Sequence, residues 1–351
     1  MEELLPKDNE NIGFPFVGPI APSEPQGFAL DQMIRCEECL RANAPTRVNC
    51  FYCASALPFT ESSAKLRKPA LRRPDKGQPG YNSIFLPQLQ SHYSNSALAD
   101  AAELLKLAPE DLERIVSAER PLPLARADSP EEASLVFDKL QSFGVETITL
   151  ADDDLGAKES SIRRIRSMHF NDDGMSLLQG GALESVRIAW PDLVLLVPGR
   201  LVVKRVEVKE RRSRRSENDI LSTSEFFADE SVVDLYTSSN SQTWRIRAHS
   251  FNFFCLGERK TLVASENLST LIDQIRSYAT QAEFDDSYNV LRPALEPVWG
   301  MQQETESSGW RRERPGKYSV GSATVSSNES QFMLYSRLSY YFNLNPSKGR
   351  R

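Results

Sequence analysis

Two Cys-x-x-Cys pairs near the N-terminus constrain this chain more than any other feature of its 351 residues. The pairs are Cys36 with Cys39 and Cys50 with Cys53, so four of the five cysteines lie close together. Each pair holds two thiolates at the spacing that a tetrahedral metal requires, and two pairs complete a closed shell of four sulfur ligands. So short a segment cannot bury enough apolar surface to fold unaided. The sequence therefore predicts one structural Zn²⁺ ion bound by these four cysteines.

The cysteine segment resembles two zinc-binding families over residues 33–58. Its paired cysteines are similar to those of bacterial zinc ribbons, and Asn43 between the pairs gives it the spacing of the Ran-binding-protein type of zinc finger. RNA-binding fingers of that type carry Trp two residues before the first cysteine, where this chain has Ile34. Zinc ribbons usually carry glycine after each pair, where this chain has Leu40 and Ala54. The resemblance implies metal binding, while these departures weigh against stacking on RNA bases.

Composition limits the classes of function and compartment. A net charge of −6 and a pI near 5.4 argue against a protein whose main task is to coat nucleic acid or an anionic membrane. The sequence has no run of 18 or more apolar residues, and its acidic opening does not resemble a signal peptide. We therefore expect a cytoplasmic protein, in which clustered cysteines are metal ligands more often than disulfides.

The length and the uneven distribution of prolines predict a multidomain α+β chain. The expected parts are a disordered tail (1–30), a zinc ribbon (31–60), a basic flexible linker (61–95), a small helical and β-α-β domain (96–158), an antiparallel β domain (160–281) and an extension with an aromatic C-terminal segment (282–351).

Hydrophobic periodicity predicts the elements of the small α/β domain. Two short helices are expected over 98–116, a strand over 122–127, a helix that begins near Ser129, and a strand over 145–150. No glycine-rich phosphate loop lies between them, so we expect no nucleotide site there. The acidic run 152–154 is interpreted either as a metal site or, by preference, as a solvent-facing helix cap.

The segment 160–280 alternates as a series of strands followed by an amphipathic helix. The expected strands are 164–170, 175–179, 186–190, 193–197, 201–208, 231–237, 243–248 and 251–256, and the helix starts at Ser265. This order resembles the pleckstrin-homology-like (PH-like) fold, in which a C-terminal helix closes a bent sheet. The resemblance implies binding of peptides, proteins or phosphoinositide headgroups and no chemistry.

A dense basic cluster falls inside that segment and offers a contact for an anionic ligand or a partner. It consists of Lys204, Arg205, Lys209, Arg211, Arg212, Arg214 and Arg215. Nearby acidic residues dilute its charge, so a solvated loop is the alternative interpretation. In the extension, the aromatic density predicts a docked helix over 329–343, and the stretch 302–328 is expected to be a loop.

Catalytic side chains are few. The three histidines are His92, His169 and His249, and no hydrolase, kinase or metalloprotease motif is present. Cys255 lies in an apolar stretch that raises a thiol pKa and leaves it inert. We therefore expect a protein that is not an enzyme.

These observations favour a non-catalytic zinc-binding interaction, adaptor or regulatory protein of the cytosol with protein partners. The alternative is a single-stranded nucleic-acid-binding protein that uses the basic linker and ribbon residues Arg35, Arg41, Asn43, Arg47, Phe51 and Tyr52.

Overall fold

The computed structural model describes ten parts of the chain, and the chain divides into two compact units, residues 1–68 and 69–351. The described residues are 28, 32–58, 71, 80–88, 93–156, 162–179, 185–211, 219–238, 242–314 and 317–349. The predicted tail, apart from residue 28, and most of the predicted linker lie outside them. We call residues 32–58 the finger and the second unit the main unit.

The finger is a small module in which the cysteines themselves form much of the interior. Strand β1 (Ile34–Arg35) pairs antiparallel with β2 (Ala42–Asn43), and a further bridge joins Asn49 to Ala56. Its core of buried residues consists of Cys36, Cys50 and Leu57. So few apolar contacts agree with a module whose stability depends on a bound metal.

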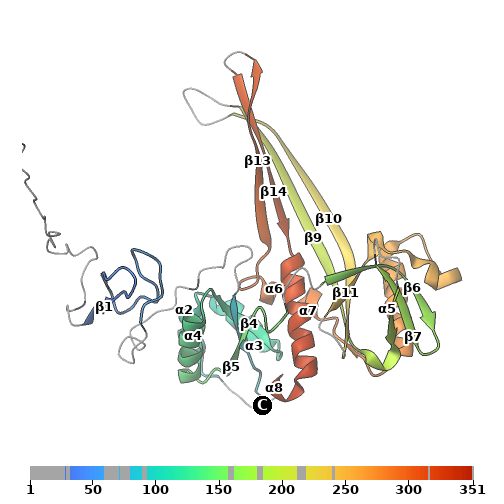
Figure 1. Cartoon of the computed structure of the whole chain (residues 1–351), viewed down its shortest axis with the longest axis horizontal. Helices are drawn as coiled ribbons and strands as arrows, with labels where there is room; N and C mark the ends of the chain where they lie inside the picture. Colours follow the sequence, from blue (N-terminus) through green and yellow to red (C-terminus); the bar gives the residue numbers. More distant parts are fainter. Residues whose placement is uncertain are drawn as a thin grey trace, which may run out of the picture. The chain divides into compact units, whose positions relative to one another are not determined.

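The main unit begins with a three-stranded antiparallel sheet in the order β4-β3-β5, with three helices packed on it (Figure 1). The elements in chain order are β3 (Tyr81–Phe85), α2 (Asn95–Leu105), α3 (Pro109–Ser117), β4 (Leu122–Ala127), α4 (Pro130–Ser142) and β5 (Thr147–Ala151). The predicted helices, β4 and the helix start at Ser129 are confirmed, and the Ser129 hydroxyl accepts from the N–H of Glu132 at 3.2 Å.

The central strand of this sheet lies inside the predicted linker, so the linker prediction does not hold for residues 81–85. Ile84 and Phe85 are buried, and the Asn82 side chain donates to the carbonyl of Leu150 at 3.2 Å. The segment escapes sequence analysis because its apolar run is very short and is flanked by proline-rich polar chain. Pairing with strands far away in sequence decides its structure.

The remaining strands form one curled nine-stranded sheet in the order β13-β14-β9-β10-β11-β6-β7-β8, with β12 beside β9. The strands are β6 (Ile162–Asn171), β7 (Gly174–Gln179), β8 (Ser185–Ala189), β9 (Leu193–Arg211), β10 (Asp219–Thr237), β11 (Thr243–Arg247), β12 (Glu283–Phe284), β13 (Gln302–Arg314) and β14 (Lys317–Ser327). The helices of this part are α5 (Ala264–Tyr278), α6 (Tyr288–Leu295), α7 (Glu329–Leu344) and α8 (Pro346–Gly349), with 3-10 turns η3 (Trp190–Asp192), η4 (Ala248–Ser250) and η5 (Phe253–Arg259). Strands β6 and β7, helix α5 and the aromatic helix α7 confirm sequence predictions.

Four segments differ from the sequence predictions. The expected strands 193–197 and 201–208 are one continuous strand, β9. The expected strand 251–256 is mostly the 3-10 turn η5, and the expected loop 302–328 is the hairpin of β13 and β14. The charged stretch after residue 208 continues β9 and begins β10, each of which is 19 residues long. These strands are rich in Ser, Thr and charged residues and lack the apolar alternation of a sheet that packs on a core. Hydrophobic periodicity in the sequence therefore does not indicate them.

Both faces of β9 are covered at its start, which explains the continuous apolar run there. Leu195 and Val197 join a cluster with α7 and the α/β part, whereas Leu196 joins a second cluster with α5. Strands that are buried on both faces read as unbroken apolar runs. Residues from the predicted domains 96–158 and 160–281 and from the extension therefore share one core, and the structure places them in a single unit.

A buried ion pair joins β10 to β11 and holds the start of α7 on the sheet. The guanidinium of Arg245 donates to both carboxylate oxygens of Asp234, at 2.7 and 2.8 Å, and both side chains have no exposed surface. Glu329 at the start of α7 adds a third contact at 3.0 Å. Removing one partner of such a pair is strongly destabilising, because the other charge would remain buried without a counter-ion.

Beyond the core, four strands continue as an exposed arm, which we define as residues 202–211, 219–231, 302–314 and 317–327 (Figure 1). Its order is β13-β14-β9-β10, and neither face is covered by a helix in the described part of the chain.

Candidate metal centre

The four cysteine sulfurs of the finger converge on one point. Their Sγ atoms all lie within 4.8 Å of one another. Sγ of Cys36 lies 3.6 Å from that of Cys53, and Sγ of Cys39 lies 3.5 Å from that of Cys50. Metal–sulfur bonds of about 2.3 Å in a tetrahedron would separate the sulfurs by about 3.8 Å. The geometry therefore suits a single tetrahedral ion, and an all-sulfur donor set suits a soft divalent metal.

Two nearly identical turns hold the sulfurs in place. Each turn contains the same two backbone hydrogen bonds. The residue after the second cysteine donates its N–H to the carbonyl of the first cysteine. The N–H of the first cysteine donates to the carbonyl of the residue two positions after the second cysteine. The bonds are Leu40 to Cys36 and Cys36 to Arg41 at 3.0 Å, and Ala54 to Cys50 at 3.0 Å and Cys50 to Ser55 at 2.8 Å. The shared pattern shows that the paired cysteines build equivalent halves of one site.

Both turns require a left-handed backbone at a residue that is not glycine. Leu40 has φ 58° and Ala54 has φ 60°, at the positions where zinc ribbons usually have glycine. A side chain in this conformation costs about 1 kcal/mol or more. Both turns keep the same geometry with Leu40 and Ala54 at these positions. The absence of glycine there therefore affects stability and not the arrangement of the sulfurs.

Polar groups around the cysteines orient the sulfur atoms. Nδ2 of Asn43 lies 3.4 Å from Sγ of Cys50, and the Tyr52 N–H donates to the same sulfur at 3.4 Å. The Ser55 hydroxyl lies 3.0 Å from Sγ of Cys36 and 2.9 Å from Sγ of Cys53. Groups of this kind set the orientation and basicity of metal ligands.

The sulfurs differ in their readiness to ionise. Burial raises the pKa of Cys50, but hydrogen bonds from backbone N–H groups, chiefly those of Cys53 and Tyr52, outweigh it and bring the pKa to about 6. The backbone N–H of Arg41 lowers the pKa of Cys39, but burial and the neighbouring sulfurs outweigh it and raise the pKa to about 12. Four thiolates this close repel one another, so full ionisation requires a bound cation.

Exposed aromatic and apolar side chains lie on the finger near the metal centre. Leu40 is 61% exposed and Phe51 is 56% exposed. The guanidinium of Arg47 lies 4.7 Å from the ring centre of Phe51, and that of Arg41 lies 4.6 Å from the ring centre of Tyr52. We call Leu40, Arg41, Arg47, Phe51 and Tyr52 the finger surface.

One residue of the proposed nucleic-acid set is not available. Asn43 is 1% exposed, and its amide is used inside the finger, where it donates to the carbonyl of Arg41 at 3.0 Å and accepts from the N–H of Phe51 at 2.9 Å. Arg35 is exposed. Asn43 is therefore a structural residue of the metal centre, a role that its spacing from the cysteines could have indicated.

The predicted basic cluster does not form one loop. Lys204, Arg205, Lys209 and Arg211 lie in strand β9, while Arg212, Arg214 and Arg215 lie outside the described residues. Successive strand residues face opposite sides, so Lys204 is on the other face from Arg205. Lys204 pairs with Glu225 at 2.8 Å, and Arg205 pairs with Glu207 at 2.7 Å. An acid of the neighbouring strand β10 and an acid of β9 itself thus neutralise part of this cluster.

The other chemical candidates in the sequence are structural. Burial raises the pKa of Cys255 to about 11, as expected for an unreactive thiol. Asp152 caps no helix: it accepts from the N–H of Gly80 at 2.8 Å and from the Asn82 amide at 2.9 Å, and it pairs with Arg126. The remaining acids of that run lie in a turn.

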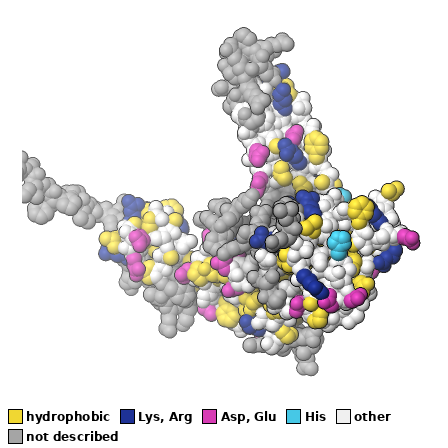
Figure 2. Space-filling view, turned by 45° about the vertical axis from the view of Figure 1, so that its right-hand side comes forward, with side chains coloured by type: hydrophobic (Ala, Val, Ile, Leu, Met, Phe, Trp, Pro, Cys, Tyr) yellow, Lys and Arg dark blue, Asp and Glu magenta, His cyan; other side chains and the backbone are white. Residues whose placement is uncertain are grey.

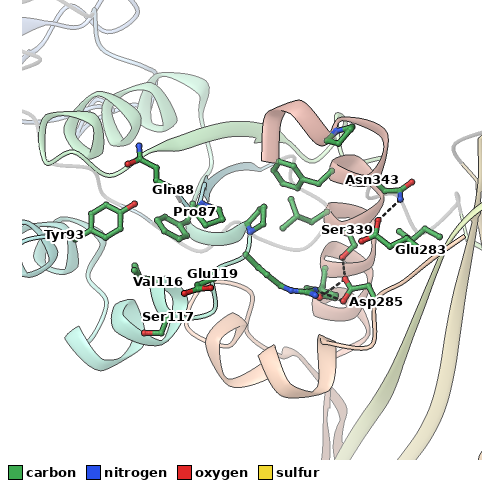
Figure 3. Close-up of a pocket in the computed structure, with 18 residues that line it drawn as sticks. Pro87, Gln88, Tyr93, Val116, Ser117, Glu119, Glu283, Asp285, Ser339 and Asn343 are labelled. Atoms are coloured by element: carbon green, nitrogen blue, oxygen red, sulfur yellow. Dashed lines mark hydrogen bonds and ion pairs between the residues drawn. The ribbon is translucent and has the colours of Figure 1, made fainter. Parts of the chain in front are cut away.

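A cavity of about 750 Å³, which no sequence motif indicated, lies in the main unit between α3, β3 and α7 (Figure 3). Asp285 lies on its wall and binds Arg120 at 2.8 Å and the hydroxyls of Tyr335 and Ser339 at 2.8 and 2.7 Å. Burial raises the pKa of Asp285, but these hydroxyls and the guanidinium outweigh it and hold the pKa below its usual value. These polar groups satisfy one another, so they do not converge on a ligand.

Comparisons with known proteins give no relative. The chain matches no protein-family model, no curated protein and no solved structure. Within the described ranges, none of the helices combines the length and apolar character needed to cross a membrane.

Proposed function

We propose that this chain is a non-catalytic, zinc-binding interaction or adaptor protein of the cytosol, and that the finger contacts a protein partner. The observation that carries the proposal is the closed set of four sulfur donors within 4.8 Å of one another. A metal with four protein ligands has no open position for substrate or activated water. Such a site supports a surface and supplies no chemistry.

Zinc is the metal that this site fits best. Two Cys-x-x-Cys turns with equivalent backbone bonds support assignment to the zinc ribbons or the Ran-binding-protein type of finger. Zn²⁺ carries no redox chemistry, and it accepts tetrahedral thiolate ligands without geometric strain. The role of the metal is to stabilise the segment 33–58, whose own hydrophobic core is very small.

The main unit supports the same class of function. Strands β6 to β8 and β9 to β11 form two antiparallel groups, joined where β11 runs parallel to β6, and α5 packs with both groups in one hydrophobic cluster. This arrangement supports the PH-like interpretation, although β9 and β10 continue into the arm. PH-like folds bind partners and carry out no reaction, and fold alone does not name the ligand.

The finger surface is the proposed contact for the protein partner. Leu40 and Phe51 are large apolar side chains on a small module, and neither contributes to its core. Aromatic residues beside arginine are typical of the centres of protein interfaces.

Affinity capture from lysate with three forms of the full chain tests this contact. Phe51→Asp should keep its metal content and lose a specific partner protein, because Phe51 is exposed and binds no metal. Glu38→Gln, an exposed change in the same finger, should retain both. Retention of the partner by Phe51→Asp would contradict the proposed contact. The metal content of the same samples would still report on the zinc site.

A second candidate, binding of single-stranded nucleic acid, is favoured by the stacking of Arg47 on the exposed Phe51. Bases stack on such rings, and arginine adds contacts to phosphate. This alternative predicts that a fluorescent single-stranded RNA binds the chain with an affinity that falls steeply with salt, and that Phe51→Ala abolishes binding. No change in anisotropy at low salt would exclude it.

A further inference from the structure

Strand β10 presents an open edge along the arm. It pairs with β11 only over Val232–Leu235, whereas its pairing with β9 extends from Thr237 to Asp219. Among the described residues, 219–231 therefore have no strand on their second side. The backbone N–H and C=O groups of such an edge are a template for another strand.

The exposed apolar side chains of this edge favour an added strand over a flat docking surface. Phe226 is 57% exposed and Phe227 is 66% exposed, and Ile220 near the start of β10 is 67% exposed. Neighbouring strand residues point to opposite faces, so a partner on one face would cover only one of the two phenylalanines. A strand paired at the edge contacts both. Figure 2 shows hydrophobic side chains on the arm.

Three acidic residues in the middle of the edge, at positions 225, 229 and 230, are already neutralised within the chain, so a basic partner is not required there. Each of these three carboxylates pairs with a cation of its own unit. The pairs are Glu225 with Lys204 at 2.8 Å, Asp229 with Arg200 at 2.5 Å and Glu230 with Arg247 at 2.5 Å. The partner should therefore be a neutral, partly aromatic strand, and a second copy of β10 has that composition.

Symmetry restricts how β10 can pair with itself. Directly opposed residues of an antiparallel pair lie on the same face, so a two-fold axis must place one residue opposite its own copy. Centring the pair on Glu225 would oppose two glutamates, and centring it on Phe227 would oppose Glu225 with Asp229. Like charges in direct opposition are destabilising.

Centring the pair on Phe226 avoids every acid–acid opposition along the regular part of the strand. Phe226 then lies opposite its own copy and gains an aromatic pair. The other oppositions are Glu225 with Phe227, Ser224 with Ala228, Thr223 with Asp229, and Ser222 with Glu230. The local bulge between Ile220 and Ser222 lies at the end of this pairing.

We propose that the protein forms a symmetric homodimer in which β10 of one arm pairs antiparallel with β10 of a second copy, with Phe226 on the two-fold axis. The two arms become one continuous eight-stranded sheet. Because the strands run in opposite directions, the rest of each main unit lies at the opposite end of this sheet from the rest of its partner.

Sedimentation equilibrium of the full chain tests the dimer. The wild-type chain should be a dimer that dissociates on dilution. Phe226→Lys should be monomeric, because it would place the ammonium groups of the two copies opposite each other at the axis. Leu262→Lys, a change at an exposed apolar residue of the main unit away from the arm, should remain dimeric. A wild-type monomer at every concentration, or a dimer that survives Phe226→Lys, would overturn the proposal.

Disulfide trapping tests the register in the same background. Under mild oxidation with oxidised glutathione, Phe226→Cys should give a covalent dimer, because its thiol meets the same thiol across the axis. Phe227→Cys should give little covalent dimer, because position 227 of each copy lies opposite Glu225 of the other copy. Equal trapping at the two positions, or trapping at neither, would overturn the assigned axis. Neither experiment depends on the metal or on the finger.

Discussion

Asn43 supports the metal centre through Cys50, because its Nδ2 donates to Sγ of that cysteine over 3.4 Å while its Oδ1 accepts from the N–H of Phe51 over 2.9 Å. Replacing Asn43 with Ala leaves the part-buried N–H of Phe51 without its acceptor, which costs about 1 kcal/mol. Losing a group that orients a ligand lowers metal affinity by about 10–100-fold. Competition of the purified protein with a chromophoric chelator measures that affinity.

The matched control is Asn49→Ala, which removes an exposed amide from the same module. It should change the affinity by less than a factor of about 3, as expected of a surface substitution of a few tenths of a kcal/mol. Equal losses in the two variants would assign the effect to general loosening of the finger.

Glycine at the two left-handed positions should stabilise the finger. Leu40→Gly and Ala54→Gly each remove the strain of a positive φ, which is worth about 1–2 kcal/mol, against a cost of about 0.4–1 kcal/mol for the more flexible unfolded chain. The net gain should appear as slower metal loss to excess chelator. Ala42→Gly in β2, where φ is not positive, should show faster loss.

Gly199 allows α7 to lie directly on β9. A Cβ atom at this position would lie 2.4 Å from a ring carbon of Phe332, which is fully buried. Gly199→Ala should therefore lower the free energy of unfolding of the main unit by about 1–3 kcal/mol, the usual cost of overpacking. Urea denaturation followed by tryptophan fluorescence measures this change.

A second substitution separates a steric clash from a loss of backbone flexibility. Phe332→Leu shortens the opposing side chain, so adding it to Gly199→Ala should cost less than the sum of the two single changes. Strict additivity would contradict the close contact between Gly199 and Phe332.

The environment of Asp285 predicts a pH dependence of stability. Its folded-state pKa lies below the ordinary value of 3.8 because the Ser339 and Tyr335 hydroxyls and Arg120 outweigh the effect of burial. The carboxylate therefore contributes stability above pH 3.8, and this contribution is lost as the pH falls through the folded-state pKa. Asp285→Asn should have a lower free energy of unfolding than wild type at neutral pH. This difference in free energy should become smaller in acid.

The neighbouring exposed Asp286 supplies the comparison for that experiment. Asp286→Asn should follow the wild-type profile of unfolding free energy against pH. A gap between Asp285→Asn and wild type that stays constant down to the acid limit would contradict a depressed pKa at Asp285.

The sequence predicted the parts of the fold that have strong local signals. Helix α7 carries dense aromatic residues, α4 has a serine cap with proline after it, and the two cysteine pairs specify their own geometry. These features depend on residues near one another in the chain.

What escaped prediction depends on distant partners. Strand β3 is a short run whose structure comes from pairing with β4 and β5, and the strands of the arm lack apolar alternation because no core covers them. The open edge at Phe226 likewise becomes visible only when the strands are placed in space.

The most direct test of the central claim is the metal content of the purified full chain, measured by elemental analysis beside the double variant Cys36→Ser, Cys39→Ser. A closed four-cysteine site predicts one zinc ion per wild-type chain and none in the variant. Retention of zinc in the variant, or its absence from the wild-type chain, would contradict the assignment of Cys36, Cys39, Cys50 and Cys53 as a closed structural zinc site.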